Sequence, residues 1–306
     1  MQLSYAQNLE DYHLDLVFAG QRSGTYVDVG GGHPVADNVS FWFYLKGWRG
    51  LVVEPQRALA DLYAHVRPRD RAVACLAGRS EGEAEFHLVQ RLHGFSTMLR
   101  ANAEGAARFG AGFATVQLPV RPLAALIAEA GLEAIDFLKI DVEGAEAEVL
   151  AGMDFRRFRP RLVLVEAVAP GSMAEAWAAW EPDLLAHGYR FAFFDRLNRF
   201  YLAEEAADLA ARLPTEPAPW DTVAHLWDCG RAPQRPDHPD HTLAKALVEG
   251  FLAELPSLDR ALLARLIERG DPALASADLP ARLAADPMRA ALGRIACMYD
   301  GGHLPE

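Results

Sequence analysis

The chain has 306 residues, with 30 Lys and Arg against 42 Asp and Glu, and a formal net charge of −12 at pH 7. A chain with this much negative charge has no general attraction for nucleic acid or for an anionic membrane. We therefore expect a neutral or cationic partner. Its cysteines, Cys75, Cys229 and Cys297, never have CxxC spacing. This excludes a disulfide framework and a cysteine zinc site and fits a reducing cytoplasm. No window approaches about 20 apolar residues, and the N-terminus carries acids where a signal peptide needs bases, so neither a membrane span nor a secretory signal is expected.

Up to about residue 205, patterns of buried strands alternate with patterns of helices. Strands are expected at 24–30, 50–55, 71–75, 83–89, 135–140, 161–166, 189–194 and 199–203. Helices are expected at 37–46, 56–66, 121–130, 144–151 and 173–186, the first of them capped by Asp37 or Asn38. This alternation predicts a doubly wound, mostly parallel α/β sheet. The four-residue gap between the last two strands predicts a closing antiparallel hairpin.

The composition of the sequence changes from about Pro214 onward. Proline-rich stretches at 214–219 and 231–239 are typical of connectors. Alanine- and leucine-rich stretches with helical spacing follow at 242–255, 258–269 and 279–298. We therefore expect a main domain over 1–213, a proline-rich connector over 214–240 and a helical C-terminal extension over 241–306.

Ligands of an open parallel sheet bind beyond the carboxyl ends of its strands. The first strand leaves through Asp28 and three consecutive glycines, Gly30–Gly32, which allow a tight turn close to a ligand. GxGxxG spacing is missing because Val35 stands where its last glycine would, and Asp28 disfavours a phosphate. The second strand ends in Glu54, where Rossmann-like sites bind a ribose diol. These signals indicate an adenosine cofactor without phosphates, against the plainer alternative of a glycine turn and a solvated acid.

Further acids follow later strands. Asp141 and Glu143 leave the strand at 135–140, and Glu166 ends the strand at 161–166, so all three are expected at one rim. Glu146 serves equally well as a helix cap. Acids this close repel one another unless a cation is present, which a sulfonium ligand, a divalent metal or a basic substrate could supply. If a metal is used, Asp141, Glu143 and Glu166 are its expected oxygen ligands, and magnesium, manganese or calcium would suit them.

Two more residues are candidates for the site. His33 follows the glycine turn and could act as a general base, with a purely structural hydrogen bond as the equal alternative. Ser96 lies in the small polar loop 94–98 and could contact cofactor or substrate. The sequence DHPDH at 237–241 looks like a metal-ligand cluster, but its place before a helix favours a connector with Asp240 as the cap.

The segments YVDVGGGHP, GWRGLVVEP, DFLKIDVEGAEAEVLAGMDF and RPRLVLVEA resemble, in order and spacing, the FkbM family of S-adenosylmethionine-dependent methyltransferases. The likeness covers about residues 3–205. It implies a class I, Rossmann-like fold of seven strands, the seventh antiparallel, with S-adenosylmethionine at the first two strand ends. Two departures are the triple glycine, where the family often has GAN or GAH, and ACLAGR at 74–79, where it commonly has an NVAVGD-like run.

The resemblance also implies roles for individual residues. It places Asp28, Gly30 and Gly32 around the methionine part of the cofactor and Glu54 on its ribose. It places Asp141, Glu143 and Glu166 near the methyl-transfer centre. The implied reaction is O-methylation of a hydroxyl on a sugar, glycan or natural product, hence a small-molecule or glycan acceptor.

Two alternatives from other classes stay open. One is a non-catalytic adenosine-binding or scaffold domain within a glycan-assembly complex. The other is a nicotinamide-dependent oxidoreductase, which the missing GxGxxG spacing and the closing hairpin disfavour. Transfer of a labelled methyl group from S-adenosylmethionine separates the methyltransferase from both.

Overall fold

The computed structural model describes residues 1, 3–89, 93–105, 108, 110–169 and 172–300. The chain forms two compact units, Met1–Leu226 and Trp227–Glu306. The residues expected around the cofactor and the acid rim all belong to the first unit, whereas the DHPDH sequence at 237–241 belongs to the second.

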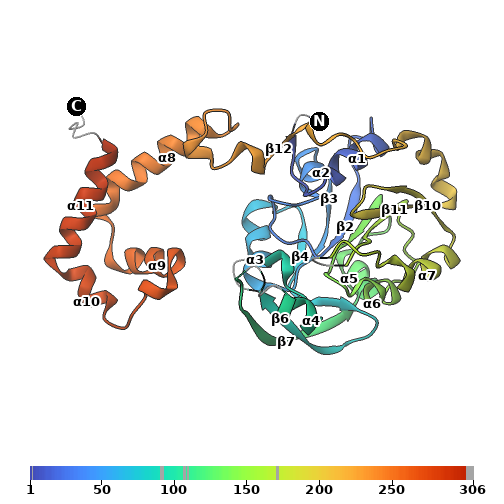
Figure 1. Ribbon diagram of the computed structural model, residues 1–306, viewed down its shortest axis with the longest axis horizontal. Helices are drawn as coiled ribbons and strands as arrows, with labels where there is room; N and C mark the ends of the chain where they lie inside the picture. The colour runs from blue at the N-terminus through green and yellow to red at the C-terminus, as the bar shows by residue number, and fades with distance from the viewer. Residues whose placement is uncertain (2, 90–92, 106–107, 109, 170–171, 301–306) are drawn as a thin grey trace. The chain divides into compact units, whose positions relative to one another are not determined.

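The first unit is built on a mixed sheet that, within the described residues, has seven strands in the order β10-β11-β9-β8-β2-β3-β4 (Figure 1). The strands are β2 (Thr25–Val29), β3 (Arg49–Val53), β4 (Arg71–Val73), β8 (Phe137–Ile140), β9 (Leu162–Glu166), β10 (Tyr189–Phe194) and β11 (Asn198–Ala203). Neighbouring strands from β4 to β9 pair parallel, whereas β11 is antiparallel to both β9 and β10. This sheet with its helices confirms the expected α/β class.

Helices connect most of these strands. They are α1 (Glu10–Val17), α2 (Phe41–Leu45), α3 (Arg57–Val66), α4 (Arg100–Gly105), α5 (Leu123–Ala130), α6 (Glu146–Ala151) and α7 (Glu181–Ala186). Short 3₁₀ turns are η1 (His93–Phe95), η3 (Trp177–Ala179), η4 (Glu204–Arg212) and η5 (Trp220–Thr222). The strands β1 (Leu3–Ser4) and β12 (Ala224–His225) pair parallel, so both ends of the first unit meet. The helix expected at 56–66 is confirmed, and the one expected at 121–130 ends at Ala130 as expected but begins at Leu123.

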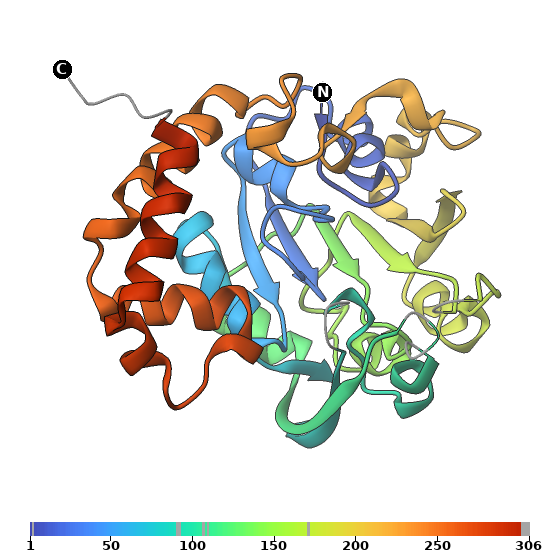
Figure 2. The same ribbon diagram turned by 60° about the vertical axis from the view of Figure 1, so that its left-hand side comes forward.

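A second, three-stranded sheet was not expected from the sequence. Its order is β5-β7-β6, with β5 (Leu76–Gly78), β6 (Gly82–Val89) and β7 (Phe113–Pro122). The strands expected at 71–75 and 83–89 are therefore not neighbours, because β4 belongs to the large sheet and β6 to the small one. The strand β7 escaped prediction because it contains two prolines and alternates exposed with half-buried residues. Figure 2 shows the small sheet at the end of the large one toward which the arrows of β2 and β3 point.

Two further expectations about helices were wrong in their bounds. The helix expected at 37–46 covers only Phe41–Leu45, because Asp37 has a left-handed backbone (φ 52°) and Ser40 takes the N-cap position. The helix expected at 173–186 begins only at Glu181, after η3, because Met173 is also left-handed (φ 57°).

The central strands are buried on both faces, which explains their apolar sequences. Side chains alternate between the faces, so Tyr26 of β2 and its register partner Phe137 of β8 lie on one face and stack at 5.5 Å. The next register pair on that face is Asp28 with Lys139, two charged residues in otherwise apolar strands.

The second unit is helical. Its helices are α8 (His241–Glu254), α9 (Arg260–Gly270), α10 (Leu279–Ala284) and α11 (Asp286–Asp300), with 3₁₀ turns η6 (Trp227–Cys229), η7 (Ala232–Gln234), η8 (Leu255–Ser257) and η9 (Pro272–Leu274). The single helix expected at 279–298 is interrupted at Ala285, whose backbone is extended. Asp240 is the N-cap residue of α8, without a side-chain capping bond. Among the described residues, no helix is long and apolar enough to cross a membrane.

Candidate active site

The carboxyl ends of four parallel strands meet at one edge of the large sheet. Val29 at the end of β2 is in register with Val53 of β3 and with Ile140 of β8, which in turn pairs with Val165 of β9. The residues that follow these four positions are therefore neighbours. They include the glycine turn, Glu54, Asp141 and Glu166, as the sequence predicted.

The glycine turn after β2 needs its glycines for different reasons. Gly30 has φ 76°, and a Cβ there would overlap the Asp141 carbonyl. A Cβ on Gly31 would meet Val52 and lie 2.8 Å from the Tyr63 hydroxyl. Gly32 has φ 57° but faces open space, with nothing within 4 Å of where a Cβ would be. The first two glycines thus allow close packing inside the protein, and the third lies where a ligand has room.

Glu54 follows β3 and holds the glycine turn. Its Oε2 accepts a hydrogen bond from the Gly32 N–H (2.7 Å), and its Oε1 accepts one from the Gln56 N–H (2.8 Å). Burial raises the pKa of Glu54, which these bonds and the charge of Lys139 partly counteract. A carboxylate has about four acceptor positions, so each oxygen can accept one further donor.

Asp28 lies beneath the turn and is fully buried. Its Oδ2 accepts a hydrogen bond from the Ser40 hydroxyl (2.6 Å), and its Oδ1 is 3.5 Å from the Lys139 ammonium. Asp28 is thus linked to the turn through Lys139, which donates to the Gly30 carbonyl, and its place around the cofactor stays a prediction.

Asp141, Glu143 and Glu166 come together as expected. One carboxylate oxygen from each residue lies within 4.8 Å of the others. Burial, and then the charge of Asp141, raise the pKa of both Glu143 and Glu166. These two carboxyls consequently keep their protons to higher pH than exposed acids would. Glu146 is different, because its Oε1 accepts from the backbone N–H groups of Val142 (3.3 Å) and Gly144 (3.0 Å) and so holds the loop before α6, whose N-cap position is Ala145.

The chain itself supplies a cation close to these acids, the ammonium group of Lys139. The Lys139 ammonium lies 3.3 Å from Asp141 Oδ2 and donates to the Gly30 carbonyl (2.7 Å). Burial alone would lower the pKa of Lys139, but the carboxylates of Asp141 and Asp28 outweigh it and raise this pKa, so the ammonium stays charged. Lys139 thus supplies one cation from within the chain, and a sulfonium ligand, a divalent metal or a basic substrate as a further counter-charge stays a prediction. Lys139 was overlooked, although its place inside an apolar strand was a signal.

The loop at 94–98 and helix α4 contact the acid cluster by binding the backbone of Glu143. Thr97 Oγ1 and Asn102 Nδ2 both donate to the Glu143 carbonyl, each at 2.9 Å. Glu143 has a left-handed backbone (φ 58°), which is unusual for a residue with a Cβ. Thr97 and Asn102 thus fix a strained residue of the site. Thr97 lies in the loop that the sequence indicated as a possible contact, whereas sequence reasoning missed Asn102. Ser96 instead accepts a hydrogen bond from the Val89 N–H inside the small sheet.

His33 stabilises the end of the glycine turn. Its Nδ1 accepts hydrogen bonds from the backbone N–H groups of Val35 (3.2 Å) and Ala36 (3.1 Å). A ring nitrogen that accepts carries no proton, so Nδ1 is committed to the turn and Nε2 is the protonated nitrogen of the neutral ring.

Comparison with known protein families agrees with this α/β fold and with the acids at its strand ends. A family model described as the methyltransferase FkbM domain matches residues 28–191, more than half of the chain. The chain belongs to this methyltransferase family, which confirms the resemblance drawn from the sequence. All candidate site residues lie within the matched range. No curated protein matches the chain.

Proposed function

We propose that this methyltransferase uses S-adenosylmethionine and methylates a hydroxyl of a sugar, glycan or natural product. The observation that carries the proposal is the trio Asp141, Glu143 and Glu166, with oxygens within 4.8 Å of one another, beside the glycine turn and Glu54. The strand order and the antiparallel β11 support the class I fold expected from the sequence.

The residues at the ends of β2 and β3 fit an adenosine cofactor. Glu54 keeps acceptor capacity on both oxygens, which is what a ribose diol requires. Gly32 leaves space beside it, and the buried acid Asp28 disfavours a phosphate at this turn. When bound, S-adenosylmethionine supplies a methyl group on a positively charged sulfur.

The acid cluster can remove the acceptor's proton. A sugar hydroxyl does not ionise at neutral pH, so its proton must leave as the new bond to carbon forms. One of Glu143 and Glu166 suits this task in its ionised form, because burial raises its pKa and so makes that form a stronger base, while the other carboxyl keeps its proton. Lys139 holds Asp141 beside them. We rank these carboxylates ahead of His33, whose Nδ1 is committed to the backbone.

A divalent metal is the alternative way to activate the hydroxyl. Asp141, Glu143 and Glu166 offer oxygen ligands that suit magnesium, manganese or calcium. Lys139 competes for the Asp141 carboxylate, which favours catalysis by the carboxylates. Chelator sensitivity separates the two modes.

The remaining parts of the proposal rest on the sequence. The acidic composition favours a neutral acceptor over a nucleic acid. The cysteines Cys75, Cys229 and Cys297, which never have CxxC spacing, support a location in the reducing cytoplasm.

The acid cluster can be tested by methyl transfer from methyl-labelled S-adenosylmethionine to a panel of sugars and glycans. We expect Glu143→Gln or Glu166→Gln to lower the rate by about 10²–10⁴, because positioned acid–base catalysis contributes that much. The measurement is made with and without chelator, and Glu148→Gln, an exposed acid of α6 paired with Arg79, is the control. If Asp141→Asn, Glu143→Gln, Glu166→Gln and His33→Ala all stay within about threefold of the parent, the catalytic assignment is wrong.

A further inference from the structure

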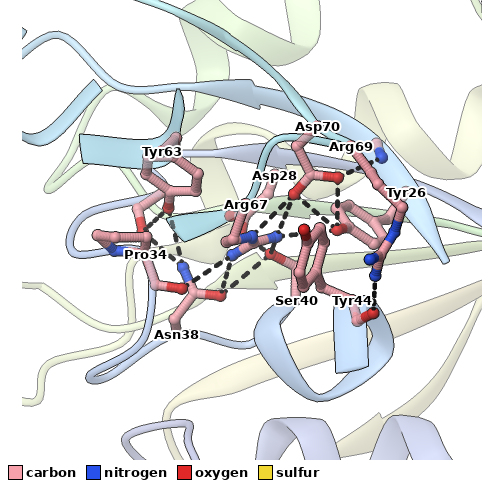
Figure 3. Close-up of polar contacts among 12 residues, drawn as sticks. Tyr26, Asp28, Pro34, Asn38, Ser40, Tyr44, Tyr63, Arg67, Arg69 and Asp70 are labelled. Atoms are coloured by element: carbon pink, nitrogen blue, oxygen red, sulfur yellow. Dashed lines mark hydrogen bonds and ion pairs between the residues drawn. The ribbon is translucent and has the colours of Figure 1, made fainter. Parts of the chain in front are cut away.

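Three buried side chains beneath the glycine turn bind backbone carbonyls of the turn and of the two residues that follow it (Figure 3). Asn38 Nδ2 donates to the carbonyls of Gly31 (2.8 Å) and His33 (3.1 Å). The Tyr63 hydroxyl donates to the same Gly31 carbonyl (2.8 Å), and Arg67 Nη1 donates to the Pro34 carbonyl (3.2 Å). These three residues, the turn frame, are all fully or almost fully buried.

The turn frame is tied together internally. Arg67 Nη1 also donates to Asn38 Oδ1 (2.9 Å), and Asn38 Nδ2 donates to the Tyr63 hydroxyl (3.0 Å). The remaining guanidinium nitrogens donate to Ser40, to Tyr26 and to Asp70, which also pairs with Arg67 as an ion pair at 2.7 Å. The guanidinium thus has hydrogen-bond partners on all sides, as a buried charge requires.

The frame has few degrees of freedom. The rings of Tyr26, Phe41, Tyr44 and Tyr63 surround the Arg67 guanidinium, each with its centroid within 6 Å. The Tyr63 hydroxyl lies 2.8 Å from where a Gly31 Cβ would be, so the turn rests directly on it. On its other side, the turn donates from Gly32 to Glu54.

We propose that Asn38, Tyr63 and Arg67 are positioning residues for the cofactor: their hydrogen bonds to the carbonyl of Gly31 and to those of the two residues that follow the turn hold the turn in the shape that binds the adenosine cofactor. This inference rests on the proposed function. A turn preorganised in this way loses little conformational freedom on binding, and this strengthens affinity without any contact between the frame and the ligand.

Calorimetric titration with S-adenosylhomocysteine tests the proposal without an acceptor. Tyr63→Phe removes only the hydroxyl that donates to Gly31, and we expect it to weaken binding about three- to tenfold, since one hydrogen bond of this kind is at stake. Asn38→Asp keeps the size and the acceptor for Arg67 but removes the donor to Gly31 and His33. We expect it to weaken binding at least as much.

Tyr189→Phe is the matched control. Tyr189 is buried, and its hydroxyl donates to the Pro160 carbonyl at 2.8 Å, the same bond as that of Tyr63 but away from the turn. Urea unfolding should show comparable losses of stability in the two Tyr→Phe variants, whereas only Tyr63→Phe should lose affinity.

The outcomes are distinct. Weakened binding by folded Tyr63→Phe and Asn38→Asp, with unchanged binding by Tyr189→Phe, supports the proposal. Parental affinity in both frame variants overturns it while leaving the proposed function intact. Equal losses in all three variants also overturn it, because the effect then follows stability and not the turn. A parent that does not bind S-adenosylhomocysteine contradicts the proposed function itself, and the inference with it.

Discussion

Lys139 connects the cofactor side of the candidate site with its acid side. Its ammonium lies 3.5 Å from Asp28 on β2 and 3.3 Å from Asp141 after β8, and it donates to Gly30 in the turn between them. One lysine thus offsets carboxylates from both strands. This explains how the acids share one edge of the sheet although their charges repel.

Another buried residue, His13 of α1, makes stability depend on pH. It lies against the rings of Phe193 and Phe200, its Nε2 accepts from the Ala218 N–H, and its Nδ1 has no partner among the described residues. Burial lowers the pKa of His13 from 6.5 to about 4. The unfolded chain therefore takes up this proton more readily than the folded one. The contribution of His13 to stability is present above pH 6.5 and is lost as the pH falls toward 4.

We expect this loss to be visible between pH 7 and pH 5. Over that interval the free energy of unfolding of the parent should fall by about 2 kcal/mol more than that of His13→Gln, which does not titrate. Urea denaturation of both proteins at the two pH values measures the difference. Parallel pH dependence in parent and variant would show that His13 is not responsible.

At the scale of elements, the glycine turn tolerates few substitutions. Gly30 combines a positive φ with the Asp141 carbonyl where its Cβ would lie, whereas Gly20 has φ 82° with nothing within 4 Å. Comparing Gly20 with Gly30 therefore separates the cost of backbone strain from the cost of overlap between a new Cβ and the end of β8.

Alanine at the two glycines should therefore have unequal effects. Gly20→Ala should cost about 1–2 kcal/mol, the usual penalty for a left-handed alanine. Gly30→Ala should cost distinctly more, because the β2 and β8 ends must move apart. Urea unfolding midpoints check this, and equal losses at both positions would contradict the close approach of Gly30 to Asp141.

The sequence predicts the elements whose signal is local. Apolar runs such as that of β9 and strand-end acids such as Glu54 and Glu166 indicated the sheet and the edge where the acids meet. Contacts that depend on register could not be read in this way. The role of Lys139 can be recognised only when the strand register places it opposite Asp28. Asn38 was mistaken for a helix cap because its partners lie on the glycine turn, on α3 and at Arg67. The strand β7 was missed because tertiary pairing with β6 overrides its prolines and polar residues.

At the scale of the whole molecule, the first unit closes on itself before the second begins. Its last strand, β12, pairs with β1 near the N-terminus, and His225 is buried. Residues 214–226 thus belong to the compact first unit and residues 227–240 to the second, so we place the boundary between the units after Leu226, inside the connector expected at 214–240.

Limited proteolysis should reflect this organisation. We expect the first cuts within 227–240, where many side chains are exposed, and a stable fragment that ends near Leu226. Mass spectrometry of the early fragments identifies the sites. Initial cleavage within the strands between Thr25 and Ala203 would contradict the proposed division.

Calorimetric titration of the purified parent with S-adenosylhomocysteine, repeated with Glu54→Gln, tests the central claim most directly. The account predicts that the parent binds, that NAD does not compete, and that Glu54→Gln weakens binding about ten- to a hundredfold, since a charge-assisted contact is lost. The exposed Glu148→Gln should bind like the parent. A folded parent that binds neither S-adenosylhomocysteine nor S-adenosylmethionine would contradict the account.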